Sequence, residues 1–450
     1  MIACKKRADS TPSKIVAAAV TVAVLTTLVK SVSLFKELAV ARNFGIGDDL
    51  DCFFVAWMFP QFLIGVINGA FAAAFVPAYI RARERARNGD RLLWQCVAAG
   101  TLMFAGVAAV LALTAPWIVS LIAAGFSAAK QAEAAVLLLI LCPTVALSGV
   151  SGIFSAALSA RERFLASALA PICNPVVVLG FLAIGGRSLR IESLAWGCVF
   201  GSCLELAVLV LLIWRSGVEF RFNLKGLRHE LRRIGGQFFP AALGQSVIGL
   251  TLIVDQSFAA SLGPGAVSSL AYGYKLVAFA ASILMIAIGS STATFVSQAI
   301  ERSDSQNVRS IISAFSRTVF LVSCGIGAVL FALSPLMVQL LFQNAAIDHR
   351  AILAVAGIQR VFAFQLPFLL VGIVYARVIA SLCETKKLLF ISAMVLVLDI
   401  IFDALLSRWF GAIGIAASTV ICYAASMIVS QRIVSRLLSV QTAHRAAEAA

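Results

Sequence analysis

The chain has 450 residues, of which 61% are hydrophobic and only 13% are charged. This composition excludes a soluble globular domain and indicates a polytopic membrane protein. The net charge of +15 would suggest a nucleic-acid partner for a soluble protein. Here Lys and Arg are concentrated in alternate loops, as the positive-inside rule predicts, so no nucleic acid is expected.

Hydropathy predicts an all-α protein with twelve membrane-spanning helices. The basic termini and loops alternate with loops that are poor in basic residues or acidic, which places both termini on the cytoplasmic side of a bacterial inner membrane. The first apolar run, from Ile15 to Val29, continues through charged residues for more than another helical turn, so it is predicted to be a retained helix and not a signal peptide. The predicted helices lie near residues 15–42, 52–80, 92–121, 134–160, 164–185, 193–214, 236–262, 267–299, 310–333, 351–382, 388–407 and 411–435.

An internal repeat relates the two halves of the chain. FVPAYIRARERARNGDR from Phe75 recurs loosely as FVSQAIERSDSQNVRS from Phe295, and APWIVSLI from Ala115 recurs as SPLMVQLL from Ser334. The two matches have nearly the same offset, which favours two pseudo-symmetric six-helix lobes, the plan of a secondary transporter. The predicted parts are an N-terminal lobe at 1–217, a basic cytoplasmic linker at 218–235, a C-terminal lobe at 236–438 and a cytoplasmic tail at 439–450.

Little in the sequence favours an enzyme. There is no G-x-x-x-x-G-K-[ST] motif, so transport is expected to be driven by a gradient or by the substrate, without a nucleotide cofactor. The three His residues lie in loops or the tail, and no Ser/His/Asp or Cys/His constellation occurs. The ten Cys residues are scattered through apolar segments without a CxxC motif, so we interpret them as small buried side chains.

Three lysines in apolar segments are candidate ligands for an anionic substrate. Lys30 and Lys36 lie in the first predicted helix, and Lys275 lies in LAYGYKLVAFA. A charge at mid-membrane costs about 2.5–3.5 kcal/mol on insertion scales, so such residues are expected to face a cavity, a partner or a ligand. Converging on a central cationic cavity, they would suit a phosphate or diphosphate. Glu37 follows Lys36 directly, and because neighbouring helical residues diverge, this pair is expected not to neutralise itself.

A second candidate site is anionic. Asp399 and Asp403 lie at i and i+4 in VLVLDIIFDALL, about 40° apart on one helix face. Asp255 lies in LTLIVDQSF, and Thr419 with the Ile415 carbonyl could supply neutral oxygens. Hard oxygen ligands suit a small cation such as Na⁺, or the carboxylates could bind protons. The alternative reading pairs Asp255 with Lys275, or places Asp403 as a cap near the outer surface.

Two segments carry a resemblance to a known family. LFKELAVARNFGIGDDLDCFFVAWMFP from Leu34 and the following NGAFAAAFVP strongly resemble the first hairpin of the MurJ/MviN family of lipid II flippases. These belong to the superfamily of multidrug, oligosaccharidyl-lipid and polysaccharide exporters. The resemblance extends to LAYGYKL and to the RERF loop at Arg161. It implies a flippase for an undecaprenyl-diphosphate-linked glycan, with lipid II as the first choice, working by cation-coupled alternating access.

The resemblance also implies roles for residues and partners. It places Lys30, Lys36 and Lys275 where the family usually has cavity arginines, and Asp51 where it keeps an aspartate at the outer end of the first hairpin. With Glu37 and Asn68, which replaces a common acidic residue, these form the predicted substrate-binding set. Membrane lipids and the cell-wall synthesis machinery are the implied partners of a monomer. A sodium site between the seventh, eleventh and twelfth helices would match Asp255, Asp399, Asp403, Ile415 and Thr419.

Several departures keep other substrates open. Lysine in place of arginine keeps the charge but loses bidentate phosphate geometry. Ile64 stands where the family often has another arginine, and twelve helices are predicted where lipid II flippases typically have fourteen. These departures favour a related flippase for an O-antigen or exopolysaccharide lipid. A cation-coupled drug exporter is disfavoured because lysines repel organic cations, and a non-transporting membrane scaffold would tolerate Lys36→Ala and Lys275→Ala.

Overall fold

The computed structural model describes residues 12–86, 89–185, 191–218, 227–301, 305–342, 349–382 and 384–449. Within these ranges the chain forms α-helices, one short 3₁₀ helix and no strands, which confirms the predicted all-α fold. The helices are α1 (Pro12–Phe44), α2 (Asp48–Ala86), α3 (Gly89–Ile122), α4 (Ala128–Ala160), α5 (Phe164–Leu169), η1 (Ala170–Ile172), α6 (Cys173–Gly185), α7 (Glu192–Trp214), α8 (Leu227–Ala260), α9 (Ala266–Glu301), α10 (Ser305–Phe342), α11 (His349–Ala363), α12 (Gln365–Ser381), α13 (Thr385–Phe410) and α14 (Ala412–Ala449).

These helices correspond to the predicted membrane-spanning segments. Eleven segments of the described residues are long and apolar enough to cross a membrane, and α1, with 33 residues, is also long enough to do so. Two spans are interrupted. The segment Phe164–Ile184 consists of α5, η1 and α6, and the segment Ala351–Ser381 is divided between α11 and α12 at Phe364. The chain is therefore a multi-pass membrane protein.

The described chain separates into two compact units. The first comprises residues 1–37, 67–109 and 143–241, and the second comprises residues 38–66, 110–142 and 242–450. The helices α1 to α4 and α8 contribute to both units. The predicted division into lobes at 218–235 stays a prediction, since residues 219–226 lie outside the described residues and α8 already begins at Leu227.

Close helix packing organises the first unit. Gly197 and Gly201 form a G-x-x-x-G pattern on α7, and a Cβ atom at Gly201 would lie 2.8 Å from the Cα of Asn174 on α6. Small residues at this spacing let two membrane helices approach each other closely. The Asn174 amide then donates a hydrogen bond to the Cys198 carbonyl at 3.2 Å. Near the chain connections, Arg161 donates hydrogen bonds to Tyr79, Asp90 and the Ser216 carbonyl.

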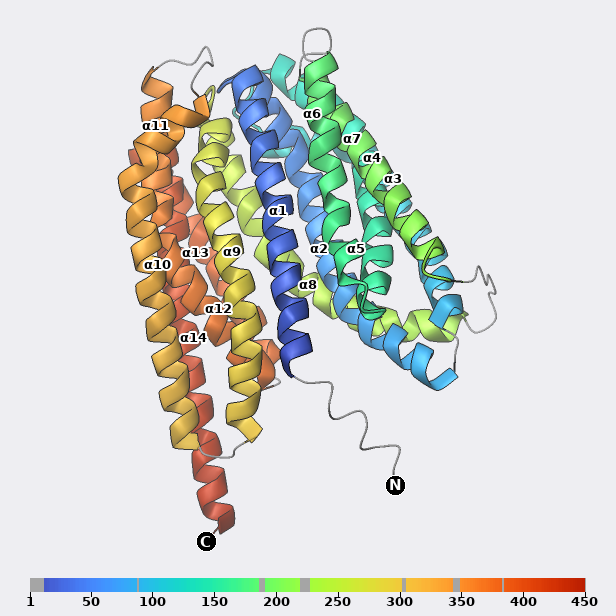
Figure 1. The fold of residues 1–450 in the computed structure, drawn as a ribbon. Helices are drawn as coiled ribbons and strands as arrows, with labels where there is room; N and C mark the ends of the chain where they lie inside the picture. Colours follow the sequence, from blue (N-terminus) through green and yellow to red (C-terminus); the bar gives the residue numbers. More distant parts are fainter. Residues whose placement is uncertain are drawn as a thin grey trace. The chain divides into compact units, whose positions relative to one another are not determined.

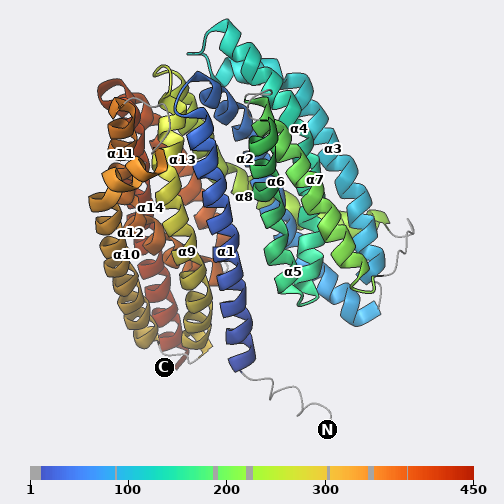
Figure 2. The ribbon, with the colours of Figure 1, turned by 45° about the horizontal axis from the view of Figure 1, so that its top comes forward.

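The second unit contains a bundle of α9 to α14, which lie side by side in Figures 1 and 2. Its apolar core includes Leu370, Val374 and Val378 from α12, together with Val434 from α14. Within this bundle α14 packs directly against α13, which carries two of the predicted cation ligands.

The positions of the repeated segments agree with a two-fold internal repeat. The first pair of segments spans the junction between α2 and α3 and the junction between α9 and α10. The second pair lies late in α3 and late in α10, where Pro116 and Pro335 each stand inside a helix. The same sequence features therefore occur at equivalent points of the two halves.

Candidate functional site

Lys36 and Glu37 form an ion pair in the first unit. The Lys36 Nζ lies 2.7 Å from Glu37 Oε1, and the two side chains are only 19% and 21% exposed. The expectation that this pair cannot neutralise itself is therefore wrong. The Cα–Cβ directions of adjacent helical residues do diverge, but both side chains are long enough to fold around the helix and meet. Lys36 is a cation held in place by its own neighbour.

Two further predicted substrate ligands lie in the first unit. Lys30 is exposed on α1, six residues or about 1.7 helical turns before Lys36. The Oδ1 atom of Asn68 on α2 is buried without a hydrogen-bond partner among the described residues, and it contacts the position where Gly152 of α4 would carry a Cβ atom. Glycine at 152 thus makes room for the amide. Their role in substrate binding stays a prediction.

Lys275 lies on α9 in the second unit, close to two aromatic rings. Its Nζ is 4.9 Å from the centroid of the Phe54 ring and 5.1 Å from that of the Tyr272 ring. A lysine ammonium at this distance is attracted by the electron-rich ring face. Sequence reasoning did not identify these aromatic partners. Tyr272 could have been found, because it precedes Lys275 by three residues and therefore shares its helix face.

Asp51 caps a helix from a distant part of the chain. Its Oδ2 accepts a hydrogen bond from the Gly265 N–H at 2.6 Å, and its Oδ1 accepts one from the Ser268 N–H at 2.7 Å. These donors belong to the N-terminal end of α9, where free N–H groups and the helix dipole favour an anion. Asp51 is fully buried, and both of its oxygens are engaged. Its predicted contact with substrate has no support from this geometry and stays a prediction.

We expect Asp51→Ala to lower the free energy of unfolding by about 1–2 kcal/mol, because the α9 N-terminus loses a charged acceptor. Asp49→Ala is the matched control, since Asp49 lies in the same turn but is exposed. Surface substitutions of this kind usually change stability by no more than about 0.5 kcal/mol. The measurement is thermal unfolding of both variants in detergent. Equal stability of the two variants would contradict the capping role.

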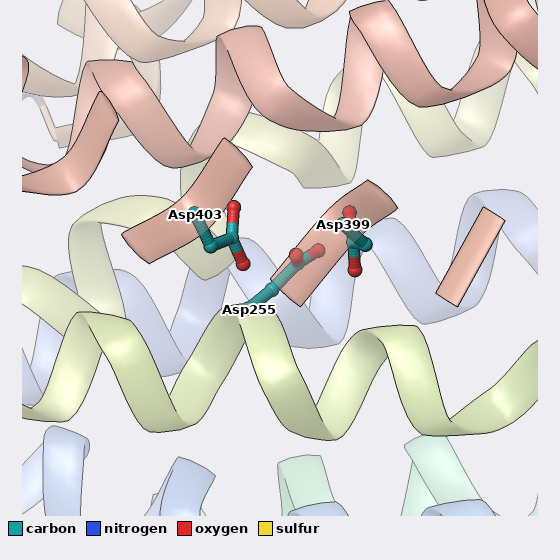
Figure 3. Close-up of side chains that lie close together, drawn as sticks. All are labelled: Asp255, Asp399 and Asp403. Atoms are coloured by element: carbon teal, nitrogen blue, oxygen red, sulfur yellow. The ribbon is translucent and has the colours of Figure 1, made fainter. Parts of the chain in front are cut away.

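An acidic cluster forms the second candidate site. Asp255 of α8 points toward Asp399 and Asp403 of α13 (Figure 3). One carboxylate oxygen from each residue lies within 4.8 Å of the others. None of the ion pairs among the described residues involves these three side chains. The structure therefore joins the three predicted carboxylates, and the alternative pairing of Asp255 with Lys275 is not among these ion pairs.

The predicted neutral ligands lie on the neighbouring helix α14. The Thr419 hydroxyl donates a hydrogen bond to the Ile415 carbonyl at 3.1 Å, so these two oxygens are joined to each other. The Ser418 hydroxyl donates a hydrogen bond to the backbone carbonyl of Asp399 at 3.4 Å, which links α14 to the acidic cluster. Three carboxylates with neutral oxygens nearby are a donor set that suits a hard cation such as Na⁺ or Ca²⁺. The assignment of Ile415 and Thr419 as ligands stays a prediction.

Relatives with a known family name resemble the chain over most of its length. The model of the family described as lipid II flippase MurJ matches residues 40–447. A lipid II flippase MurJ from Burkholderia cenocepacia is 27% identical over 376 residues, which cover 81% of this chain and 72% of the relative. A probable lipid II flippase MurJ from Thermotoga maritima is 25% identical over 399 residues, covering 88% of this chain and 80% of the relative.

Solved structures share the fold. A lipid II flippase MurJ in an inward closed conformation superposes with a TM-score of 0.79 at 22% identity, covering 92% of this chain and 87% of that chain. An inward-facing multidrug transporter of the MATE family, from the MOP superfamily, has a TM-score of 0.73 at 13% identity over 93% of this chain and 94% of that chain. These two matches establish the fold, and the match to the family model shows which family the chain belongs to. The chain belongs to the lipid II flippase MurJ family.

Proposed function

We propose that this chain is a flippase that carries lipid II from the cytoplasmic to the outer leaflet of the bacterial inner membrane. The observation that carries the proposal is the family match, which runs from the end of α1 to the end of α14. Proteins of this family are transporters, so the chain is not an enzyme. We further propose that both termini are cytoplasmic, in keeping with the basic loops, and that the protein acts as a monomer alongside the cell-wall synthesis machinery.

The lysines are the proposed ligands of the diphosphate. Lys36 is a partly buried cation on a membrane helix, and Lys275 is oriented by two rings. Both can donate charge-assisted hydrogen bonds to phosphate oxygens. Lys30, which also lies on α1, adds a third positive charge to the proposed set of ligands. The Glu37 carboxylate is the internal counter-ion of Lys36, so a diphosphate that binds Lys36 takes over a position that Glu37 holds without substrate.

The acidic cluster is the proposed site of the coupling cation, with Na⁺ as the ion first expected from sequence. Asp255 lies on a different helix from Asp399 and Asp403. A cation that binds all three carboxylates would therefore hold α8 and α13 together. Ion binding and release can then bias the helix arrangement, which is what alternating access requires.

Complementation tests the proposed substrate. The native lipid II flippase is depleted from a bacterium, and this chain is expressed in its place. We expect growth and cell shape to be restored, because a chain that moves lipid II supplies the missing step. The comparison strain carries an empty vector, and the amount of this chain in the membrane is measured by immunoblotting.

Failure of a well-expressed chain would contradict lipid II as the substrate. The same chain is then tested in a strain that lacks its O-antigen flippase, since Ile64 stands where the family often has an arginine. Rescue of O-antigen display in that strain would assign the chain to another polyprenyl-linked glycan.

A further inference from the structure

Arg360 is a positive charge on a membrane-spanning segment without an acidic partner in the part of the chain that the structure describes. It lies in the last turn of α11, inside the candidate span Ala351–Ser381, and none of the ion pairs among the described residues involves it. Hydrocarbon does not solvate such a charge, so an arginine at this position requires a ligand or a partner. Neither the proposed diphosphate ligands nor the acidic cluster includes Arg360.

The Arg360 guanidinium is held in place by α10, which packs against α11 (Figure 1). Pro335 stands inside α10 and has no N–H, so the Phe331 carbonyl four residues earlier has no helical donor. The Arg360 Nε donates a hydrogen bond to this carbonyl at 3.4 Å. Its guanidinium carbon also lies 5.4 Å from the centroid of the Phe331 ring, where the ring face attracts a cation. The guanidinium is therefore fixed beside Phe331.

This contact leaves most of the guanidinium available for a ligand. An arginine has five N–H donors, and the bond to Phe331 occupies one of them. Among the described residues, the four N–H groups on Nη1 and Nη2 have no recorded hydrogen-bond partner. They form a planar fork that matches two oxygens of a phosphate group. The bond to Phe331 thus orients a fork that can still bind an anion.

The surface around Arg360 is apolar and exposed. Leu353 and Phe364 lie on the same face of α11 as Arg360, seven residues before it and four residues after it. Both side chains are exposed, as is Phe331 on α10. On a membrane-spanning segment, exposed side chains of this kind contact lipid acyl chains. Arg360 is therefore a cation within a surface that suits lipid.

Helix length places this cation close to the lipid phosphates. The span Ala351–Ser381 has 31 residues, or about 46 Å of helix, and a hydrocarbon core of about 30 Å leaves about 8 Å outside at each end. Arg360 lies about 13 Å along the helix from Ala351, so its Cα is about 5 Å inside the hydrocarbon boundary. Phe331 lies equally far from the end of the span Arg309–Leu340. The guanidinium is thus within reach of a phosphate group at that boundary.

We propose that Arg360 binds the phosphate of an anionic membrane phospholipid, whose acyl chains lie along Leu353, Phe364 and Phe331. A lipid with a net negative headgroup is favoured over a zwitterionic one, because the ammonium of a zwitterionic headgroup already balances its own phosphate. With the proposed cytoplasmic termini, the bound lipid belongs to the outer leaflet. This site is separate from the proposed transport of lipid II, and lipid binding can be measured without that substrate.

The test is native mass spectrometry of the purified full chain, stripped of lipid and titrated with phosphatidylglycerol or with phosphatidylethanolamine. We expect the first phosphatidylglycerol to bind at least about tenfold more tightly than the first phosphatidylethanolamine. Arg360→Gln keeps an N–H donor for the Phe331 carbonyl but removes the charge. It should weaken phosphatidylglycerol binding at least about tenfold and change phosphatidylethanolamine binding much less.

Arg408→Gln is the matched control, since Arg408 is exposed in the last turn of α13 and lies outside the proposed site. It should bind phosphatidylglycerol within about twofold of the wild type, because fully exposed charges contribute little. Arg360→Lys covers the case in which Arg360→Gln does not fold. Lysine keeps the charge and loses the fork, so phosphatidylglycerol binding should weaken about threefold or more.

Three results would overturn the proposal. The wild type could bind the two lipids equally well, both Arg360 variants could bind phosphatidylglycerol as tightly as the wild type, or Arg408→Gln could lose as much binding as Arg360→Gln. The last result would mean that any arginine of this protein attracts the lipid. Because no step of this test uses lipid II, its outcome is independent of the complementation experiment.

Discussion

Lys36→Ala is expected to abolish rescue of a strain depleted of its lipid II flippase, although the protein reaches the membrane in normal amounts. Lys36 lies on a membrane helix and is 19% exposed, so its charge is only weakly screened by water. A hydrogen bond between a charged donor and a phosphate oxygen contributes about 1.5–3 kcal/mol. Its loss corresponds to roughly 10–100-fold weaker binding of the diphosphate. Lys36→Arg keeps the charge and should restore growth.

The ion pair with Glu37 requires a second variant. Lys36→Ala also removes the ammonium that lies 2.7 Å from Glu37 Oε1, and a partly buried carboxylate that loses a nearby positive charge can damage a protein by itself. The double variant Lys36→Ala/Glu37→Gln removes that carboxylate and isolates the contribution of the lysine to substrate binding. We expect the double variant to fold like the wild type and still to fail in complementation. If it supported normal growth, the function of Lys36 would be to neutralise Glu37, and the ligand role would be wrong.

The membrane spans could be predicted from the sequence, because each membrane helix requires a long apolar run whichever helices pack against it. The interruptions were harder to find. The short η1 turn contains Pro171, which cannot donate the hydrogen bond that a continuous helix needs. The break at Phe364 comes three residues before Pro367, where the proline ring likewise restricts the preceding backbone. Their effect on helix continuity depends on neighbouring helices.

The candidate sites likewise include features that could be predicted from the sequence and features that could not. The pairing of Asp399 with Asp403 follows from helix periodicity, which is a local property. Asp51 could not be assigned to its cap by local reasoning, because its partners Gly265 and Ser268 lie more than two hundred residues away. The Lys36–Glu37 pair was predicted wrongly because helix geometry fixes the Cβ directions and leaves the ends of long side chains free to meet.

Asp403→Asn is expected to make the protein more stable in a solution without Na⁺ and Ca²⁺, while it abolishes rescue. The three carboxylates lie close together and have no basic partner in the described ion pairs, so they repel one another. Replacing one of them with a neutral group of the same shape removes part of this repulsion. Substitution of poorly compensated buried charges can stabilise a protein by about 1–4 kcal/mol. Thermal unfolding in sodium-free and calcium-free buffer measures the change.

Replacing a carboxylate outside the cluster with an amide should lower stability instead of raising it. This comparison separates the effect of the cluster from any general effect of removing a carboxylate. Glu37→Gln removes the partner of Lys36 and should lower stability. With saturating Na⁺, the order of wild type and Asp403→Asn should reverse, because an ion that binds only the folded wild type stabilises it by mass action. If Asp403→Asn were less stable under both conditions, its carboxylate would serve the fold directly. The expected reversal would instead mean that the cluster destabilises the protein until an ion binds, so that a bound cation would shift the arrangement of α8 and α13 by relieving this repulsion.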